Sequence, residues 1–176
     1  MTRIVPPEPF SQDRYAVRPS LDLVVLNPEE AAGVGSLLSV IEPWASYPIW
    51  EDDLTRYFSR IEPGAPRYAI VHGGLLAGAL SVRTNWLCGT YIQIIGLTPM
   101  CQNRGYGTAL LEFVEGQARL GGDANLWVCV SDFNTEARRF YERYGFVRTA
   151  ELEDLVCDGR TEILMRKRLD TQPPTA

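Results

Sequence analysis

A turn with two glycines, set between a strand-like run and an amphipathic helix, is the feature that most constrains the fold. Residues 91–97 form an apolar run that predicts a strand, and residues 105–120 carry apolar side chains at helical spacing. The first turn of a helix leaves backbone N–H groups unpaired and carries a partial positive charge, and glycine lets a ligand approach those groups. The strand, turn and helix together predict a phosphate-binding site.

Two common nucleotide fingerprints do not describe this turn. The dinucleotide fingerprint requires a third glycine where this chain has Leu110. The P-loop requires Gly-Lys-Ser/Thr, and the turn contains no lysine. The turn does match the pattern [Gln/Arg]-x-x-Gly-x-[Gly/Ala]. This short pattern is weak by itself, because an ordinary helix start after a tight turn also explains one of the glycines.

A second motif follows the next predicted strand. Asn134 comes first, Tyr141 follows seven residues later, and Gly145 and Phe146 end the segment. Seven residues of helix place Asn134 and Tyr141 near the same face, two turns apart. With both motifs in this order, the chain resembles the GNAT superfamily of acyl-CoA-dependent N-acetyltransferases. The resemblance covers the element order over residues 21–169 and is specific over residues 91–146.

The resemblance implies a binding site for acetyl-CoA. It implies that Ile95 and Leu97 pair with the pantetheine amides and that Asn134 hydrogen-bonds the same arm. Tyr141 would protonate the leaving thiolate; its alternative role is that of a core aromatic, as expected for its neighbours Phe140 and Tyr144. The pyrophosphate would be held by the amides of Gln102, Asn103, Arg104, Gly105, Tyr106, Gly107 and Thr108.

The implied chemistry is direct attack of an amine on the acetyl thioester, without a covalent enzyme intermediate. Backbone N–H groups near Leu97 would stabilise the oxyanion. No general base is assigned, because Tyr91 and Gln93 stand where some family members carry a glutamate. A chain of water molecules is one alternative. The other candidates for the base are six carboxylates in charge runs, which are usually solvated: Glu51, Asp52, Asp53, Glu151, Glu153 and Asp154.

The expected acceptor is a primary amine, preferably on a small molecule. Enzymes of the family that act on protein N-termini commonly carry Leu-Glu-Val-Arg on the strand before the asparagine, and residues 127–131 of this chain differ from it. A protein N-terminus or lysine, and a CoA-binding or regulatory module without turnover, stay as alternatives. Trp44, Tyr47, Ile49 and Trp50 indicate either an apolar acceptor or ordinary packing.

The predicted fold is a GNAT-like α+β domain, a mixed and mostly antiparallel central sheet flanked by helices, in the order β-α-α-β-β-β-α-β-α-β-β. The first helix is expected to begin at Pro28, with Asn27 as its cap, and to end before Pro43. The second covers about residues 51–61. Residues 1–20 are expected to be a flexible segment, residues 21–169 the single domain and residues 170–176 a flexible tail.

Composition limits the partners. The chain has 176 residues and a formal net charge of −5, which argues against nucleic acid or an anionic membrane as the main partner. Four scattered cysteines and a single histidine, His72 in a predicted hairpin turn, indicate no metal site and reduced thiols in a cytoplasmic protein. No apolar run reaches the roughly 18 residues of a membrane helix. A homodimer is possible by analogy with relatives.

Overall fold

The computed structural model describes residues 8–169 and contains one sheet of eight strands, in the order β1-β2-β3-β4-β5-β6-β8-β7. Every neighbouring pair is antiparallel except β5 and β6, which are parallel. The predicted class, a mostly antiparallel α+β sheet, is confirmed. The strands are β1 (Arg14–Arg18), β2 (Leu21–Val25), β3 (Arg67–His72), β4 (Leu75–Arg83), β5 (Gly89–Leu97), β6 (Asn125–Ser131), β7 (Val147–Glu153) and β8 (Thr161–Arg168).

Strand β1 was not predicted, and it lies in the segment expected to be flexible. It pairs antiparallel with β2 at the edge of the sheet. Tyr15 anchors it, with its ring packed against Tyr68 and Phe113 at centroid separations of 6.1 and 4.8 Å. Five residues with only two inward side chains give too short an alternation to be recognised locally. The observed order therefore begins with one more strand, while the predicted tail at 170–176 lies outside the described residues.

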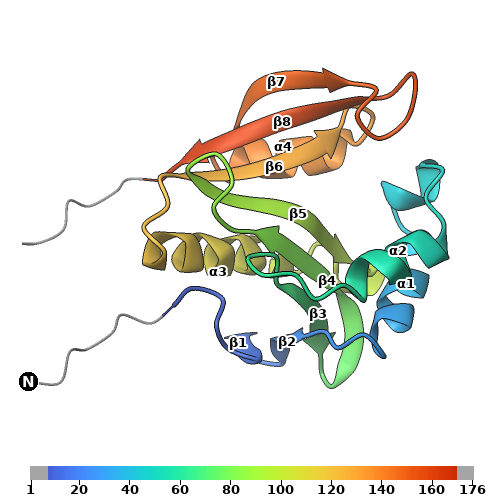
Figure 1. Cartoon of the computed structure of the whole chain (residues 1–176), viewed down its shortest axis with the longest axis vertical. Coiled ribbons are helices and arrows are strands. Elements are labelled where there is room, and N and C mark those ends of the chain that lie inside the picture. Colours follow the sequence, from blue (N-terminus) through green and yellow to red (C-terminus); the bar gives the residue numbers. More distant parts are fainter. Residues whose placement is uncertain (1–7, 170–176) are drawn as a thin grey trace, which may run out of the picture.

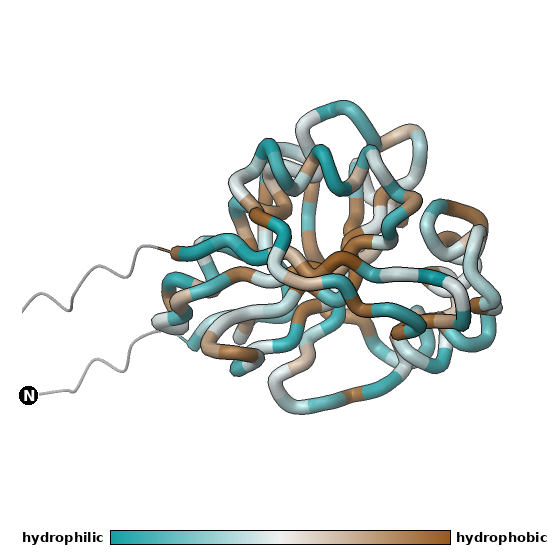
Figure 2. Tube along the Cα trace, turned by 90° about the horizontal axis from the view of Figure 1, so that it is seen from above, coloured by the Kyte–Doolittle hydropathy of each residue, from teal (hydrophilic) through white to brown (hydrophobic). Residues whose placement is uncertain are grey.

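Two pairs of helices cover opposite faces of the sheet. Helices α3 (Tyr106–Leu120) and α4 (Thr135–Arg143) pack on one core cluster, and α1 (Ala31–Ser39) and α2 (Glu51–Phe58) pack on the other. Short 3₁₀ turns, η1 (Trp44–Ser46) and η2 (Pro99–Cys101), complete the described elements. In Figure 2 the hydrophobic segments gather along the strands at the centre, and the hydrophilic ones lie mainly in outer loops and helix surfaces.

The predicted cap of the first helix forms, but α1 begins later than expected. The Asn27 side chain accepts from the Glu30 amide at 3.0 Å, and the Glu30 carboxylate accepts from the Asn27 amide at 3.4 Å. This reciprocal pair closes a turn over residues 28–30, and regular α-helix starts at Ala31. The local capping chemistry was predicted correctly, whereas the start of the helical ladder differs by three residues.

The two parallel strands separate partway along their length. β5 pairs with β6 from Gly89 to Ile92, opposite Asn125 to Val128, and the pairing ends there although both strands continue. Figure 1 shows β5 and β6 diverging toward the end of the sheet where α1 and α2 lie. A gap between two strands exposes main-chain N–H and C=O groups that a sheet would otherwise pair.

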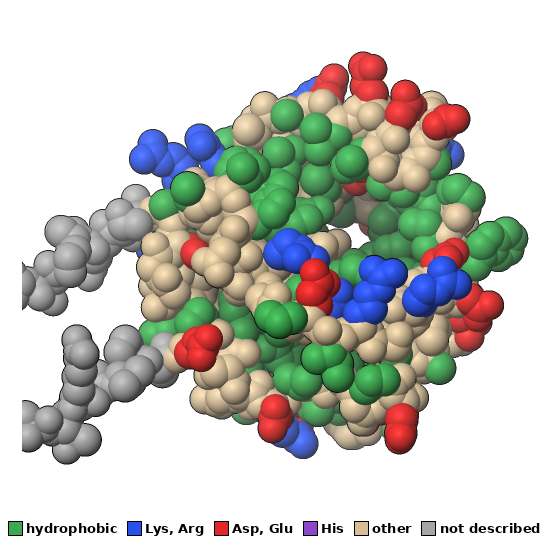
Figure 3. Space-filling model, in the orientation of Figure 1, with side chains coloured by type: hydrophobic (Ala, Val, Ile, Leu, Met, Phe, Trp, Pro, Cys, Tyr) green, Lys and Arg blue, Asp and Glu red, His purple; other side chains and the backbone are tan. Residues whose placement is uncertain are grey.

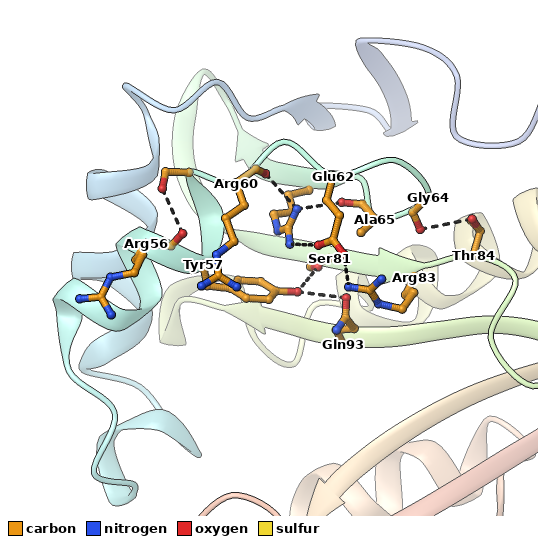
Figure 4. A network of polar contacts seen from close by, with 12 residues as sticks. Arg56, Tyr57, Arg60, Glu62, Gly64, Ala65, Ser81, Arg83, Thr84 and Gln93 are labelled. Carbon is orange, nitrogen blue, oxygen red and sulfur yellow. Dashed lines mark hydrogen bonds and ion pairs between the residues drawn. The ribbon is translucent and has the colours of Figure 1, made fainter.

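A buried arginine ties the segment after α2 to β3. The guanidinium of Arg67, 4% exposed, donates to the carbonyls of Arg60 and Ala65 at 2.9 and 3.1 Å, and to the Glu62 carboxylate at 3.1 Å. Arg83 of β4 donates to the other oxygen of Glu62 at 2.9 Å (Figure 4). The Arg83 and Arg67 hydrogen bonds hold the pKa of Glu62 below its ordinary value.

Candidate active site

A cleft of about 1030 Å³ opens at the gap between β5 and β6. Figure 3 shows the molecule hollowed at its centre, with hydrophobic side chains around the opening and Lys and Arg side chains at its rim. The turn before α3, the last residues of β5 and the start of α4 line one part of the cleft, and the segment around η1 and the start of β8 line another. The cleft brings both sequence motifs into one site.

The turn before α3 presents a run of unpaired amides. Within the described residues, no backbone or side-chain acceptor bonds the N–H groups of residues 103–108, and the ladder of α3 begins with the Ala109 amide donating to the Gly105 carbonyl. Asn103 and Gly105 both have positive φ, 57° and 76°. Alternation of this kind turns successive N–H groups toward one side, which makes an anion-binding nest.

Gln102 differs from its neighbours in this turn. Its amide donates to the Pro99 carbonyl at 3.3 Å, and its side-chain Nε2 donates to the Leu97 carbonyl at 2.9 Å. The side chain of Gln102 therefore fastens the turn to the end of β5, and its amide closes the 3₁₀ turn η2. The available amides begin at Asn103 rather than at Gln102.

For each of the two glycines, the structure gives a reason other than the expected one, which was the close approach of a ligand to the amides. Gly105 is required by its left-handed φ of 76° at the cap of α3. Gly107 is required by packing, because a β-carbon there would lie 3.1 Å from the ring of Phe140 on α4. Both glycines line the cleft, and a β-carbon would meet the Arg18 side chain at Gly105 and the Phe140 ring at Gly107.

Two side chains of the turn lie outside the cleft. Arg104 is exposed and does not line it. Tyr106 turns toward β3, where its hydroxyl hydrogen-bonds His72 Nε2 at 2.8 Å and the two rings lie 5.1 Å apart. His72 is the last residue of β3 and is partly buried and paired, so it is not the solvated turn residue that its place beside Gly73 and Gly74 suggests. Residues 104 and 106 have only their amides to offer a ligand at this site.

The exposed edge of β5 presents the backbone of Ile95 and Leu97 to the gap. The Thr98 amide donates to the Ala77 carbonyl of β4 at 2.9 Å. Because backbone groups alternate between the two sides of an antiparallel strand, Gly96 also turns toward β4, and Ile95 and Leu97 turn away from it. The sequence had assigned these same two residues to pantetheine binding.

Asn134 and Tyr141 line the cleft from α4. Asn134 caps the helix, its Oδ1 accepting from the Ala137 amide at 3.1 Å, so its Nδ2 group is the part left to face a ligand. Tyr141 is 5% exposed and packs between Phe140 and Phe146, with ring centroids at 5.3 and 5.6 Å. Burial raises the pKa of its hydroxyl well above the ordinary value, so the group stays protonated.

Two features of the cleft were missed from the sequence. Arg139 and Arg143 both line the cleft from α4. They are four residues apart and so lie on the same side of the helix, and this spacing could have indicated a pair of cations in the site. At the other part of the cleft, the buried hydroxyl of Tyr47 donates to Glu162 on β8 and is hydrogen-bonded to the Ser131 hydroxyl on β6 at 3.0 Å. No local pattern links these three positions, which are far apart in sequence.

Gln93, which stands where some family members carry a glutamate, lines the cleft, and its side chain is held by Tyr57. The Tyr57 hydroxyl donates to its Oε1 at 3.2 Å and contacts Ser81 Oγ at 2.5 Å (Figure 4). The carboxylates of the charge runs lie outside the cleft, in keeping with their solvated alternative: Glu51, Asp52, Asp53, Glu151, Glu153 and Asp154.

The aromatic segment after α1 divides between the two expected roles. Trp44 and Ile49 line the cleft and also pack on the core cluster beneath α1 and α2. Trp50 is 75% exposed and does not line the cleft. Trp44 and Ile49 therefore pack on the core and also present apolar surface to the cleft.

Within residues 8–169, no group of three or more His, Cys, Asp or Glu side chains has the arrangement of a metal site. None of the helices in that part of the chain has the length and apolar character needed to cross a bilayer.

Comparison with curated proteins finds a relative among N-acetyltransferases. An N-acetyltransferase of Lactobacillus delbrueckii subsp. lactis, uncharacterized and encoded in the pepI 3′ region, is 35% identical over 82 residues, and the match spans 46% of this chain and 47% of that protein. The chain thus spans about half the length of this curated relative.

Two solved structures share the fold. The ribosomal-protein-S18-alanine N-acetyltransferase of Escherichia coli superposes with a TM-score of 0.71 at 18% identity, covering 89% of this chain and 98% of that one. Nourseothricin acetyltransferase gives a TM-score of 0.56 at 26% identity, covering 60% and 66%. The sequence model of the acetyltransferase (GNAT) family matches residues 28–146. With both motifs gathered in one cleft and this match over most of the domain, the chain belongs to the GNAT acetyltransferase family.

Proposed function

We propose that this protein transfers an acetyl group from acetyl-CoA to the primary amine of a small molecule. The observation that carries the proposal is the cleft itself, where unpaired amides, an exposed strand edge and a buried tyrosine meet in one space. Each of these matches the chemistry of one part of acetyl-CoA, a substrate that members of this family use.

The pyrophosphate would bind at the start of α3. Six consecutive amides, residues 103–108, are available there, and the N-terminus of a 15-residue helix adds its partial positive charge. Arg139 and Arg143 supply full charges from α4 across the cleft. A protein with a net charge of −5 can hold an anionic ligand here because the donors are gathered locally.

The pantetheine arm would bind along the exposed edge of β5. Its two amides can pair with the backbone of Ile95 and Leu97 as an added strand would. The Leu97 carbonyl already accepts from Gln102, so Leu97 contributes its N–H. Asn134 would donate from its Nδ2 group on the opposite side of the gap.

The reaction we propose is direct acyl transfer. An N–H group of β5 near Leu97 would donate to the developing oxyanion. Tyr141 would donate to the sulfur as the thiolate leaves. Because burial keeps its hydroxyl protonated, Tyr141 serves first as a hydrogen-bond donor to sulfur, and a thiolate with a pKa of about 8.5 needs no stronger acid to depart.

A small-molecule acceptor fits the wall of the cleft near η1. Trp44, Ile49 and Val156 contribute apolar surface there. The shared fold includes an enzyme named for a ribosomal-protein alanine and one named for nourseothricin, so the fold by itself favours neither acceptor class.

The test has two stages. Acetyl-CoA should raise the melting temperature, because a ligand of the folded state stabilises it by about 2.7 kcal/mol at 100 times its Kd, whereas NAD and ATP should do much less. Thiol release from acetyl-CoA is then followed with a panel of small primary amines and with peptides bearing free N-termini. Stabilisation without thiol release for any acceptor would favour the CoA-binding module, and absence of stabilisation would reject both.

A further inference from the structure

Glu162 is a buried carboxylate without a cation. It is 6% exposed, lines the cleft, and forms no ion pair with any lysine or arginine among the described residues. Its protein partner in the cleft is the hydroxyl of Tyr47. Removing a carboxylate from water costs several kcal/mol unless a counter-charge or sufficient hydrogen bonds compensate. A cationic ligand would supply the positive counter-charge that Glu162 lacks.

The sheet places Glu162 and Tyr141 on opposite faces. Ser131 and Glu162 are cross-strand partners, and so are their neighbours Val130 and Ile163. Val130 and Ile163 belong to the core cluster that contains Tyr141, so the alternation of side chains puts Ser131 and Glu162 on the other face. The gap between β5 and β6 joins the two faces. A thioester held in that gap has Tyr141 on one side and Glu162 on the other.

Glu162 also lies close to the predicted end of the pantetheine arm. The Asn134 amide donates to the carbonyl of Ser131 at 2.9 Å, and Ser131 is the residue paired with Glu162. One hydrogen-bonded turn therefore separates the helix cap from the carboxylate. The apolar side chains Trp44 and Ile49 line the same cleft beside Tyr47 and give room for the body of an acceptor.

We infer that Glu162 is the residue that receives the ammonium group of the acceptor and takes its proton, with Tyr47 as its positioning residue. This inference rests on the proposed acetyl transfer. It assigns the acceptor as a primary amine that is cationic in solution, attached to an apolar body.

The step balances as follows. The ammonium gives one proton to the Glu162 carboxylate, and the nitrogen lone pair forms a bond to the acetyl carbonyl carbon. The C–S bond breaks with its electron pair on sulfur, which accepts the hydrogen bond of Tyr141 and then takes a proton from solvent. The second nitrogen proton passes to solvent. The products are the N-acetyl amide and free CoA thiol, and Glu162 returns its proton to solvent.

The other titratable groups near this carboxylate do not compete as bases. They are Tyr47, which follows η1, Tyr91 of β5 and Cys129 of β6. Burial raises the pKa of Tyr47, Tyr91 and Cys129 above their ordinary values, and for Tyr47 the hydrogen bond to Glu162 adds to it. These three groups stay protonated at neutral pH.

The deciding variant is Glu162→Gln, which keeps an oxygen that can accept from Tyr47 and so keeps the packing. Its matched control is Glu153→Gln, an exposed position on β7 outside the cleft. Both variants should bind acetyl-CoA as the unchanged protein does, measured by titration. With an alkylamine from the panel, Glu162→Gln should lose roughly 10²- to 10⁴-fold in kcat/KM, the range for one acid–base group.

Acceptors that differ in protonation state distinguish two roles of Glu162, that of a base and that of a residue that only holds the local structure. An alkyl ammonium has a pKa of about 10.4, as lysine does. The loss of kcat/KM in Glu162→Gln should therefore shrink as the pH rises toward that value. The loss should also be small for an arylamine that is already neutral at the assay pH. Tyr47→Phe should lose less kcat/KM than Glu162→Gln does, and its rate should still depend on acceptor protonation as in the unchanged protein.

Two outcomes overturn the inference in different ways. If Glu162→Gln turns over the alkylamine like the unchanged protein at every pH, or loses equally for the neutral arylamine, Glu162 is not the base, while the acetyltransferase function stands. If the unchanged protein binds acetyl-CoA but releases no thiol with any amine, the proposed function fails and this inference fails with it.

Discussion

Gly107 on α3 and Phe140 on α4 are in direct contact, close enough that a β-carbon on Gly107 would lie 3.1 Å from the Phe140 ring. Real β-carbons rarely approach a neighbour so closely, so any side chain at position 107 must push the ring. Both residues line the cleft. The first turn of α3 and the cleft-facing side of α4 are therefore coupled through this contact.

Replacing Gly107 tests that coupling. Gly107→Val should displace Phe140 and weaken acetyl-CoA binding, measured by titration, while most of the fold is retained. Gly116 is the matched control, because it lies within α3 and a β-carbon there meets nothing within 4 Å. Gly116→Ala should stabilise the protein by about 0.5–1 kcal/mol from helix propensity alone. Gly107→Ala should fall short of that gain; an equal gain would contradict the contact.

The arginines of α4 should matter more for acetyl-CoA than the arginine of the turn. Arg143→Ala removes a charge that lines the cleft, and a partly screened contact with a phosphate is worth about 1 kcal/mol, or roughly fivefold in Kd. Arg104→Ala removes an exposed charge outside the cleft and should change Kd little. Binding is measured at low and high salt, where the Arg143 effect should diminish with screening. A larger loss in Arg104→Ala would reverse this assignment.

Tyr141→Phe tests the proposed hydrogen bond to sulfur. The substitution keeps the ring between Phe140 and Phe146, so acetyl-CoA affinity should hold while kcat falls roughly 10- to 10⁴-fold. The control is Tyr68→Phe, another buried tyrosine, whose hydroxyl donates to the Phe10 carbonyl at 3.2 Å away from the cleft. That variant should lose about 1 kcal/mol of stability and keep its kcat. Full activity in Tyr141→Phe would return Tyr141 to the core.

Glu115 should make stability depend on pH. Burial acts to raise its pKa, but hydrogen bonds from Lys167 at 2.7 Å, Arg119 at 2.8 Å and Tyr144 at 3.0 Å outweigh it, and the pKa is lowered. A lowered pKa in the folded state stabilises the protein above the unfolded value, and the contribution is lost as the pH falls through the folded value.

Glu115→Gln should therefore destabilise the protein by about 1 kcal/mol at neutral pH, after allowance for solvent screening. The difference from the unchanged protein should vanish in acid, as followed by urea unfolding across pH. The matched control is Glu112→Gln on the exposed side of the same helix. A constant difference at all pH values would show that the ionised form of Glu115 is not what stabilises the fold.

Much of the fold could be predicted from the sequence because its signals are local. Alternation and helical spacing located the strands and helices from Leu21 onward, glycines marked their ends, and the Asn27–Glu30 capping pair formed as expected. The two motifs located α3 and α4 because each contains a turn and the helix that follows it. The edge strand β1 escaped, since its anchor Tyr15 depends on Tyr68 and Phe113, which come from elsewhere in the chain.

The sequence by itself determined the family and predicted the residues that would meet acetyl-CoA, because consecutive residues make the amide turn and the Asn134–Tyr141 face. Only the tertiary structure decided what surrounds them. Tyr47 and Glu162 are 115 positions apart and meet because the residue that follows η1 packs against the start of β8. Whether a carboxylate is buried without a cation depends on contacts between distant segments, and no local spacing encodes those contacts. The proposed acceptor side of the site is therefore a property of the folded chain.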